Sequence, residues 1–229
     1  MVSPSSVDGG FSLVELLVAV ALLCLLAFFG VPALQSFRAR MHGAECVNRL
    51  RQTGTILHAF LGENQSRLTL LVAGGNDYKA RQKLWYNQLA GHAGLSEGDS
   101  QAVFACPLNH ATVTARYCYG FRRAGKPGVG TVNPDGGTYY TLNTLQVARP
   151  AGYFIAADSA MTERLQTWRI HPTQFAADGG AVYLGHRGRA NVLFLDGHVE
   201  ALDAEGLYEK TDIRVALGPE YEPLTLPLP

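Results

Sequence analysis

The pattern of apolar and polar positions divides the first sixty residues into two helical segments. Leu16–Phe37 contains no charged residue, and a helix of roughly 22 residues is about 33 Å long, enough to cross a membrane core of about 30 Å. Beyond it, apolar or small residues recur at alternating intervals of three and four, which is typical of a helix with one buried stripe. That stripe consists of Val47, Leu50, Gly54, Leu57 and Leu61.

Gly30 and Pro32 interrupt the first segment and predict a bend, after which the helix continues. A single helix from Phe11 to about Leu61 is near 76 Å long, and its second half can hide its stripe only against a sheet or another chain. The alternative of a cleaved secretory signal peptide is disfavoured, because the run is too long and the residues before it include Asp8 but no Lys or Arg.

The remaining chain predicts mainly strands. Residues 64–100 indicate a connecting region with one short helix over 78–89. Short strands are expected at 102–107, 115–121 and 152–158. Asp196-Gly197 lies between two apolar runs and predicts a two-residue hairpin over 191–202, in which Phe194 pairs with Val199 and Val192 with Ala201. This register makes one face of the hairpin wholly apolar. The residues from 218 to the end are expected to extend along the surface.

These elements predict an α+β fold in which a long N-terminal helix packs on a small antiparallel sheet. The expected boundaries are a leader at 1–10, a transmembrane helix at 11–37, an amphipathic spine helix at 38–62, and a globular domain at 63–229. We refer below to the helix over 38–62 as the spine.

The net charge does not indicate a partner, because 19 basic and 19 acidic residues cancel. The chain therefore has no overall positive potential that would attract nucleic acid. Arg122, Arg123 and Lys126, near Tyr119 and Phe121, suggest a small basic and aromatic patch, which we interpret as solvated surface. Nucleic acid is therefore not an expected partner.

Three of the four cysteines lie beyond the apolar run, so at most one pair can form among them. Cys106 could pair with Cys118 across a short loop, or Cys46 could pair with Cys106 if the sheet packs on the spine. The sequence does not rank these two pairings. Cys24 lies within the apolar run itself.

Several histidines and aspartates have the chemistry of metal ligands or of acid and base partners. They are His186, His198, Asp158 and Asp196. We interpret them as structural residues, with His186 capping or hydrogen-bonding the Asp196 turn, and we expect no metal site and no catalytic residue. Calcium could bind at the loops 133–137 and 178–180, but neither has clustered carboxylates and ordinary turns are favoured.

Glu15 is a carboxylate at the start of the apolar run, and such a charge in a bilayer core costs roughly 2.5–3.5 kcal/mol. It belongs to the stretch Gly10-Phe11-Ser12-Leu13-Val14-Glu15. This stretch resembles the cleavage and methylation signature of type IV prepilins and type II secretion pseudopilins. Pro32 lies where those helices commonly carry a proline. The leader departs from the pattern in lacking a basic residue, and Glu15 could also simply snorkel to the interface.

The resemblance implies that a prepilin peptidase cleaves after Gly10 and methylates the amine of Phe11. It also implies that Glu15 pairs with the terminal amine of a neighbouring subunit, which makes two costly charges tolerable. The globular domain would lie outside the inner membrane of a bacterium. The positive-inside rule taken alone conflicts with this orientation, because arginines such as Arg38 and Arg40 follow the helix.

A second resemblance lies in the C-terminal half. His186, followed after nine residues by Asp196-Gly197, is similar to the His-x9-Asp-Gly signature of a large group of prepilin-like proteins. Other landmarks of that group lie at 50–52, 104–107, 117–120 and 157–159.

The two resemblances imply a structural subunit of a type IV pilus-like or type II pseudopilus filament. This subunit would be no enzyme, and its partners would be the peptidase, other pilins and an inner-membrane assembly platform. Alternatives are a membrane-anchored binding protein or enzyme that uses the leader for sorting, and a minor pilin that captures DNA.

Overall fold

The fold comes from a computed structural model, which describes residues 13–73, 84–107, 119–123, 129–132, 138–176 and 180–227. Within these ranges, the side chains of residues 27, 30–40, 71–73, 97, 101, 129–132 and 138–139 are outside the description.

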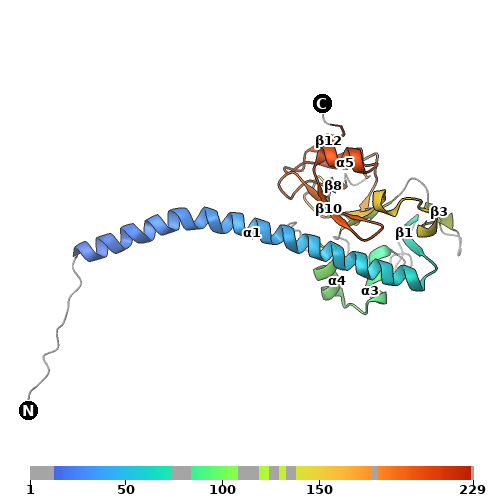
Figure 1. Cartoon of the computed structure of the whole chain (residues 1–229), viewed down its shortest axis with the longest axis horizontal. Helices are drawn as coiled ribbons and strands as arrows, with labels where there is room; N and C mark the ends of the chain where they lie inside the picture. Colours follow the sequence, from blue (N-terminus) through green and yellow to red (C-terminus); the bar gives the residue numbers. More distant parts are fainter. Residues whose placement is uncertain are drawn as a thin grey trace, which may run out of the picture. The chain divides into compact units, whose positions relative to one another are not determined.

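Helices occur mainly in the first half of the chain and strands in the second (Figure 1). The helices are α1 (Leu13–Glu63), α3 (Trp85–His92), α4 (Glu97–Phe104) and α5 (Ala204–Lys210), with short 3-10 turns at Thr144–Gln146 and Pro150–Gly152. The strands are β1 (Arg67–Ala73), β2 (Gly120–Arg122), β3 (Val129–Val132), β4 (Thr138–Asn143), β5 (Phe154–Ala157), β6 (Ser159–Ala160), β7 (Arg169–Ile170), β8 (Ala181–Tyr183), β9 (Ala190–Phe194), β10 (Val199–Leu202), β11 (Val215–Leu217) and β12 (Pro223–Thr225).

The chain forms two compact units, Met1–Met41 and His42–Pro229, and α1 contributes to both. α1 is a single helix of 51 residues, so the prediction that it continues beyond Gly30 and Pro32 is confirmed. In the first unit, every side chain described from Leu13 to Phe29 is exposed. Within the described part of the chain, no helix has both the length and the apolar content required to cross a membrane.

The described strands of the second unit form three sheets. One has the order β1-β4-β3, the central one β10-β9-β5-β2-β7, and the third β12-β11-β8-β6. Most pairs are antiparallel, but β2 with β7 and β8 with β11 are parallel. The class is therefore α+β as predicted, whereas the prediction of one small antiparallel sheet is wrong.

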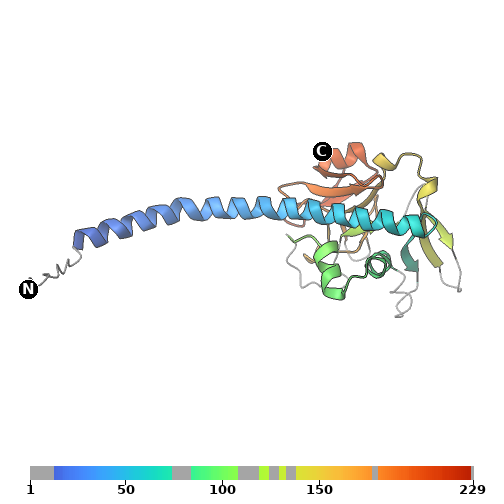
Figure 2. The same cartoon turned by 60° about the horizontal axis from the view of Figure 1, so that its bottom comes forward.

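The predicted stripe of α1 is buried from Leu50 to Leu61 against the central sheet, whereas Val47 is half-buried. Leu50 and Leu57 are within 1% of full burial, and each such side chain stabilises the fold by about 1.5–3 kcal/mol. At Gly54, a Cβ would lie 3.0 Å from Cδ1 of Leu193 in β9, so the helix and the strand approach closely there. In Figure 2 this half of α1 crosses in front of the strands.

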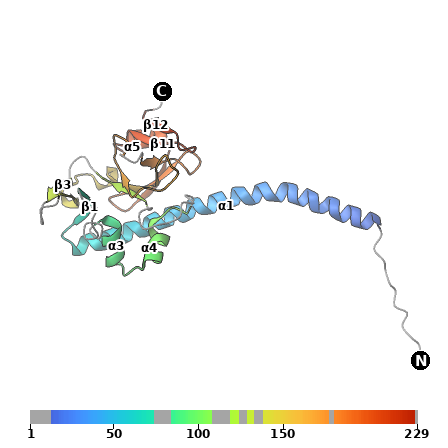
Figure 3. The ribbon, with the colours of Figure 1, turned by 180° about the vertical axis from the view of Figure 1, so that it is seen from behind.

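α3 and α4 lie on the side of this helix half that is opposite β8, β10 and α5 (Figures 1 and 3). Trp85 of α3 is fully buried, and its ring stacks on Phe121 of β2 with centroids 3.7 Å apart. Its Nε1 donates a hydrogen bond to the carbonyl of Trp168 at 2.9 Å. The short helices thereby share one apolar cluster with α1 and the central sheet.

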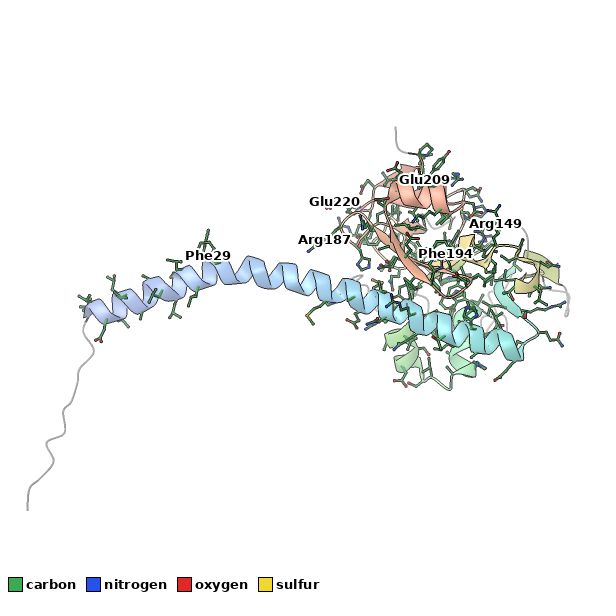
Figure 4. All side chains as sticks on the ribbon, in the orientation of Figure 1. Phe29, Arg149, Arg187, Phe194, Glu209 and Glu220 are labelled. Carbon is green, nitrogen blue, oxygen red and sulfur yellow. The ribbon has the colours of Figure 1, made fainter. Side chains whose placement is uncertain are left out.

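The other face of the central sheet covers a second apolar cluster. Val192 and Phe194 of β9 pack there with residues of β8, β11 and α5, whereas Leu193 and Leu195 belong to the cluster around α1. Figure 4 shows Phe194 in the interior of this unit. β9 is thus buried on both faces, and the expected apolar face that combines Phe194 with Val199 is not formed, because Val199 packs with Leu193 in the cluster around α1.

The predicted hairpin exists, but its register differs by one residue. Val199 pairs with Leu193 and Ala201 with Asn191, and the turn contains three residues rather than two. The amide of Gly197 donates to the carbonyl of Phe194 at 3.0 Å, and Gly197 has φ +94°. A tight turn followed by a left-handed glycine is the three-residue alternative to the two-residue hairpin, and it moves every side-chain pair by one position.

The strand predicted at 102–107 is wrong, because residues 97–104 form α4. The Ser96 side chain accepts a hydrogen bond from the amide of Asp99 at 3.2 Å and so caps the helix. A Ser followed three residues later by an acid is a helix-start signal that outweighs the short apolar run after it.

The other predicted elements have mixed outcomes. The strand expected at 152–158 is confirmed as β5, and the strand expected at 115–121 is described only from residue 119, where β2 begins at Gly120. The short helix expected at 78–89 begins at Trp85 in the described part. β1, β3 and β4 were not predicted, and the C-terminal tail adds β12 to a sheet instead of only lying on the surface.

A charged pair near β2 joins a buried arginine to a carboxylate that is 31% exposed. Arg122 is 2% exposed, and its Nη1 donates to Oδ1 of Asp212 at 2.6 Å while Nη2 bonds Oδ2. The guanidinium also lies 4.5 Å from the ring centroid of Tyr153 and 4.8 Å from that of Phe154. The pair connects β2 to the segment after α5.

The close contact at Gly54 predicts a difference between two glycines of α1. Gly54→Val forces two methyl groups toward Leu193 and is expected to destabilise the fold by about 1–3 kcal/mol. Gly62→Val is the matched control, since a Cβ at Gly62 meets nothing within 4 Å, and it is expected to be neutral or slightly stabilising. Urea unfolding of the full chain in detergent measures both, and equal effects would contradict the packing.

The Arg122 pair predicts a large loss of stability. Arg122→Met removes two charge-assisted hydrogen bonds to Asp212, which stays partly hydrated, and is expected to cost about 1.5–3 kcal/mol. Lys210→Met is the control, because it removes an exposed pair with Glu200 worth less than about 1 kcal/mol. Thermal unfolding of the two variants compares them, and a similar small shift for both would contradict a stabilising role for the Arg122–Asp212 pair.

Candidate functional site

Four ligand-type side chains meet beneath the second half of α1. Cys46, Cys106, Asp158 and His186 each present one donor atom, and these atoms all lie within 4.8 Å of one another. We call these residues the Cys-Cys-Asp-His cluster. Three of them are nearly fully buried, and the His186 side chain is 11% exposed.

Each residue of the cluster comes from a different part of the fold. Cys46 lies on the buried face of α1, one turn before Leu50, and Cys106 follows α4. Asp158 is the single residue between β5 and β6, and His186 lies in the loop between β8 and β9. Arg187, the residue after His186, lies at the edge of the unit in Figure 4.

Asp158 occupies the point where the chain passes from the central sheet to the third sheet. Its amide donates to the carbonyl of Asn191 in β9 at 3.0 Å, and its carbonyl accepts from Tyr183 of β8 at 2.9 Å. Oδ2 of its carboxylate also accepts from the backbone amide of Asn191 at 2.7 Å and from the side-chain amide at 2.9 Å. The carboxylate is therefore held in one orientation.

Short polar contacts connect the four side chains. The Cys46 thiol donates to Oδ1 of Asp158 at 2.8 Å, and Nε2 of His186 lies 3.2 Å from Oδ2 of Asp158. The same Nε2 lies 3.3 Å from Sγ of Cys106. One imidazole nitrogen thus faces both a carboxylate and a thiol.

The surroundings shift the proton affinities of the cluster in different directions. Burial raises the pKa of Cys46 well above its usual value, whereas hydrogen bonds from Cys46 and from His186 lower the pKa of Cys106 despite its burial. Burial alone would lower the pKa of His186, but its bonds to Asp158 and Cys106 outweigh that effect and raise the pKa to about 10. Cys106 therefore loses its thiol proton more readily than an ordinary cysteine, whereas His186 keeps its second ring proton more strongly than an ordinary histidine.

Two further contacts position the cluster. The hydroxyl of Tyr119 lies 3.1 Å from the carbonyl oxygen of Cys46 and 3.3 Å from its Sγ, and burial raises the pKa of Tyr119, so the phenol keeps its proton. Nη1 of Arg49 donates to the carbonyl of Ala105 at 2.9 Å. This bond ties α1 to the segment that carries Cys106.

The interpretation of His186 as a partner of the Asp196 turn is wrong, because His186 contacts Asp158 and Cys106. The Asp196 carboxylate instead accepts from the amide of His198 at 3.1 Å and lies 2.6 Å from its Nδ1. Burial opposes ionisation of Asp196, but these bonds lower its pKa. His198 therefore belongs to the hairpin and not to the Cys-Cys-Asp-His cluster.

Of the two predicted disulfides, the structure describes both cysteines of only one, Cys46–Cys106. Cys46 and Cys106 are both free thiols in the structure, although they lie in the same cluster, and Cys24 is a free, exposed cysteine of α1. The proposed Cys46–Cys106 disulfide is therefore not formed here. Cys118, and with it the Cys106–Cys118 pairing, lies outside the described residues.

The structure corrects the interpretation as solvated surface for most described members of the basic and aromatic patch, while Arg123 is half-buried. Arg122, Tyr119 and Phe121 are all buried, and Lys126 lies outside the described residues. The observation on which a DNA-capturing role depended is thereby removed. Both candidate calcium loops fall largely on residues 133–137 and 177–179, which the structure does not describe.

The N-terminal candidates are only partly visible. Gly10 and Phe11 lie outside the described residues, and Pro32 lies within α1 with its side chain outside the description. Glu15 is in the first turn of α1 and is exposed. Apolar side chains on both sides of it are exposed as well, among them Val14 at 69% and Leu16 at 61%.

Sequence reasoning named all four residues of the cluster but did not bring them together. Asp158 and His186 were considered as ligands, and Cys46 and Cys106 as a disulfide. A combined signal was present, because Cys46 lies on the same helical face as Leu50 and Leu57, and the other three residues lie in or beside the landmark segments.

Comparison with known protein families gives a match at the N-terminus. Residues 6–31 match the family described as the prokaryotic N-terminal methylation motif. Neither a curated protein nor a solved structure matches the chain. The motif supports a prepilin-type protein, and it covers the leader junction, Glu15 and the first part of α1.

Proposed function

We propose that this protein is a structural subunit of a type IV pilus-like or type II secretion pseudopilus filament, with no catalytic activity of its own. The observation that carries the proposal is the methylation motif at residues 6–31, which implies processing by a prepilin peptidase. Cleavage after Gly10 would make Phe11 the methylated N-terminus and Glu15 the fifth residue of the mature chain.

The first unit has the surface expected of a helix that packs against other helices or lipid. Its described apolar side chains are exposed from Leu13 to Phe29, and residues 16–37 carry no charge. Before assembly this helix would anchor the subunit in the bacterial inner membrane, with the second unit outside. In the filament, the same side chains would pack against neighbouring subunits.

Glu15 gives this assembly a register. A carboxylate among exposed apolar side chains is stabilised when it pairs with an amine. In the filament, that amine would be the methylated N-terminus, Phe11, of a neighbouring subunit. Because Phe11 precedes Glu15 by only one helical turn, this pairing would fix the offset between the two chains. The second unit would then be the pilin-like head, carried on the spine. Within this proposal, the remaining partners are other pilins and an inner-membrane assembly platform.

Processing is the first test. Full-length chain produced with an active prepilin peptidase is expected to begin at N-methylated Phe11, as read by mass spectrometry of the intact protein. Gly10→Val should abolish the cleavage, because the residue before the scissile bond must be small, whereas Gly9→Ala should leave it intact. A wild-type chain that still begins at Met1 in such a host would contradict the proposal.

Assembly is the second test. Glu15→Gln removes the charge at almost constant volume and is expected to lower the yield of sheared filaments by about tenfold or more, while cleavage after Gly10 persists. Glu63→Gln is the matched control, because Glu63 is an exposed carboxylate at the other end of α1. If Glu15 only snorkels to the membrane surface, the two variants will assemble equally well.

A further inference from the structure

The Cys-Cys-Asp-His cluster has no role in the filament proposal, yet hydrogen bonds and short polar contacts join all four of its side chains. Two thiols, one imidazole and one carboxylate converge on a single point from four segments up to 140 residues apart in sequence, from Cys46 to His186. Isolated polar groups at this depth are costly, so their convergence needs a physical reason.

The chemistry of the four donors is that of a zinc site. Zn²⁺ prefers thiolate sulfur and imidazole nitrogen, accepts carboxylate oxygen, and is almost always four-coordinate in structural sites. The set also argues against calcium and magnesium, because those ions prefer an all-oxygen shell.

The spacing of the donors also suits a tetrahedral ion. Ligand atoms at about 2.0–2.3 Å from a tetrahedral ion lie roughly 3.3–3.8 Å from one another. The observed separations are 3.3 Å from Cys106 Sγ to His186 Nε2, and 2.8 Å from Cys46 Sγ to Asp158 Oδ1. The separation between Cys46 and Asp158 is that of a hydrogen bond, and it must lengthen by about 0.5 Å when an ion replaces the thiol proton. All four donor atoms already lie within 4.8 Å of one another.

The groups around the donors resemble an outer ligand shell. Asn191 occupies Oδ2 of Asp158 with two N–H donors, which leaves Oδ1 directed toward Cys46. Tyr119 offers its hydroxyl to Cys46 Sγ, which would stabilise a thiolate there. Partners of this kind fix ligand orientation and commonly accompany metal sites.

We propose that Cys46, Cys106, Asp158 and His186 bind one Zn²⁺ ion as a closed structural site that fastens α1 to the central and third sheets. Four protein ligands leave no open position for a substrate, and the burial of the cluster agrees with a structural ion rather than a catalytic one. Zinc takes the place of the two thiol protons and of any proton on Nε2 of His186, these protons pass to solvent, and no group is oxidised or reduced.

A disulfide between Cys46 and Cys106 is the competing state, since an oxidising exterior favours it. It would use two of the four side chains and leave the Asp158 and His186 pair without a function. The convergence of all four donors therefore favours the ion, and the experiment distinguishes the two states.

The test measures the metal content of the full chain, purified in detergent through a tag without histidine. Inductively coupled plasma mass spectrometry is expected to find about one zinc ion per chain in the wild type. Cys106→Ser and His186→Gln should each reduce this content at least tenfold, because each removes a ligand. Cys24→Ser is the matched control, since Cys24 is an exposed cysteine outside the cluster, and it should keep the zinc.

A wild-type measurement keeps the test decisive if the variants fail to fold. A zinc chelator is expected to lower the unfolding midpoint of the wild-type chain by about 5 °C or more, and added Zn²⁺ should restore it. Wild-type chain with no more zinc than Cys106→Ser would overturn the proposal. So would an intact mass lower by two hydrogens with Cys46 and Cys106 joined, which identifies the disulfide. Neither result bears on processing or assembly, so the filament proposal is tested separately.

Discussion

The second half of α1 must bury one stripe of side chains, and the fold of the second unit depends on that requirement. An amphipathic helix of this length does not hide Leu50 or Leu57 by itself, so the central sheet supplies β9 as the opposing surface. The approach is close enough at Gly54 that no side chain larger than hydrogen fits without displacing Leu193. α3 and α4 then cover the opposite side of the same helix.

The periodic part of this arrangement could be predicted from the sequence. An interval of three and four identifies a helix face because it depends only on neighbouring residues, and the stripe from Leu50 to Leu61 is buried as expected. The hairpin was located for a similar reason. Its register was not, because the number of turn residues depends on the left-handed conformation of Gly197, and Asp-Gly is compatible with turns of two or three residues.

The cluster could not be assembled from the sequence because its members depend on tertiary contacts. Cys46 reaches the others only after α1 packs on β9, and Asp158 only after the chain changes sheets between β5 and β6. Each residue also has an adequate local explanation: a buried helix face, a helix end, a strand end or a loop. Local explanations gave no reason to combine them, and so His186 was assigned to the wrong partner.

The two ends of the His-x9-Asp-Gly segment, His186 and Gly197, both lie against α1. Nδ1 of His186 lies 3.8 Å from the position of a Cβ on Gly43, and a Cβ on Gly197 would lie 3.2 Å from Nε2 of His58. Both ends therefore touch α1, at points separated by roughly 22 Å of helix. The number of residues between His186 and Gly197 therefore has to match the distance between these two points on α1. Inserting or deleting one residue would leave every side chain present, but His186 and Gly197 could not both keep their contacts with the helix.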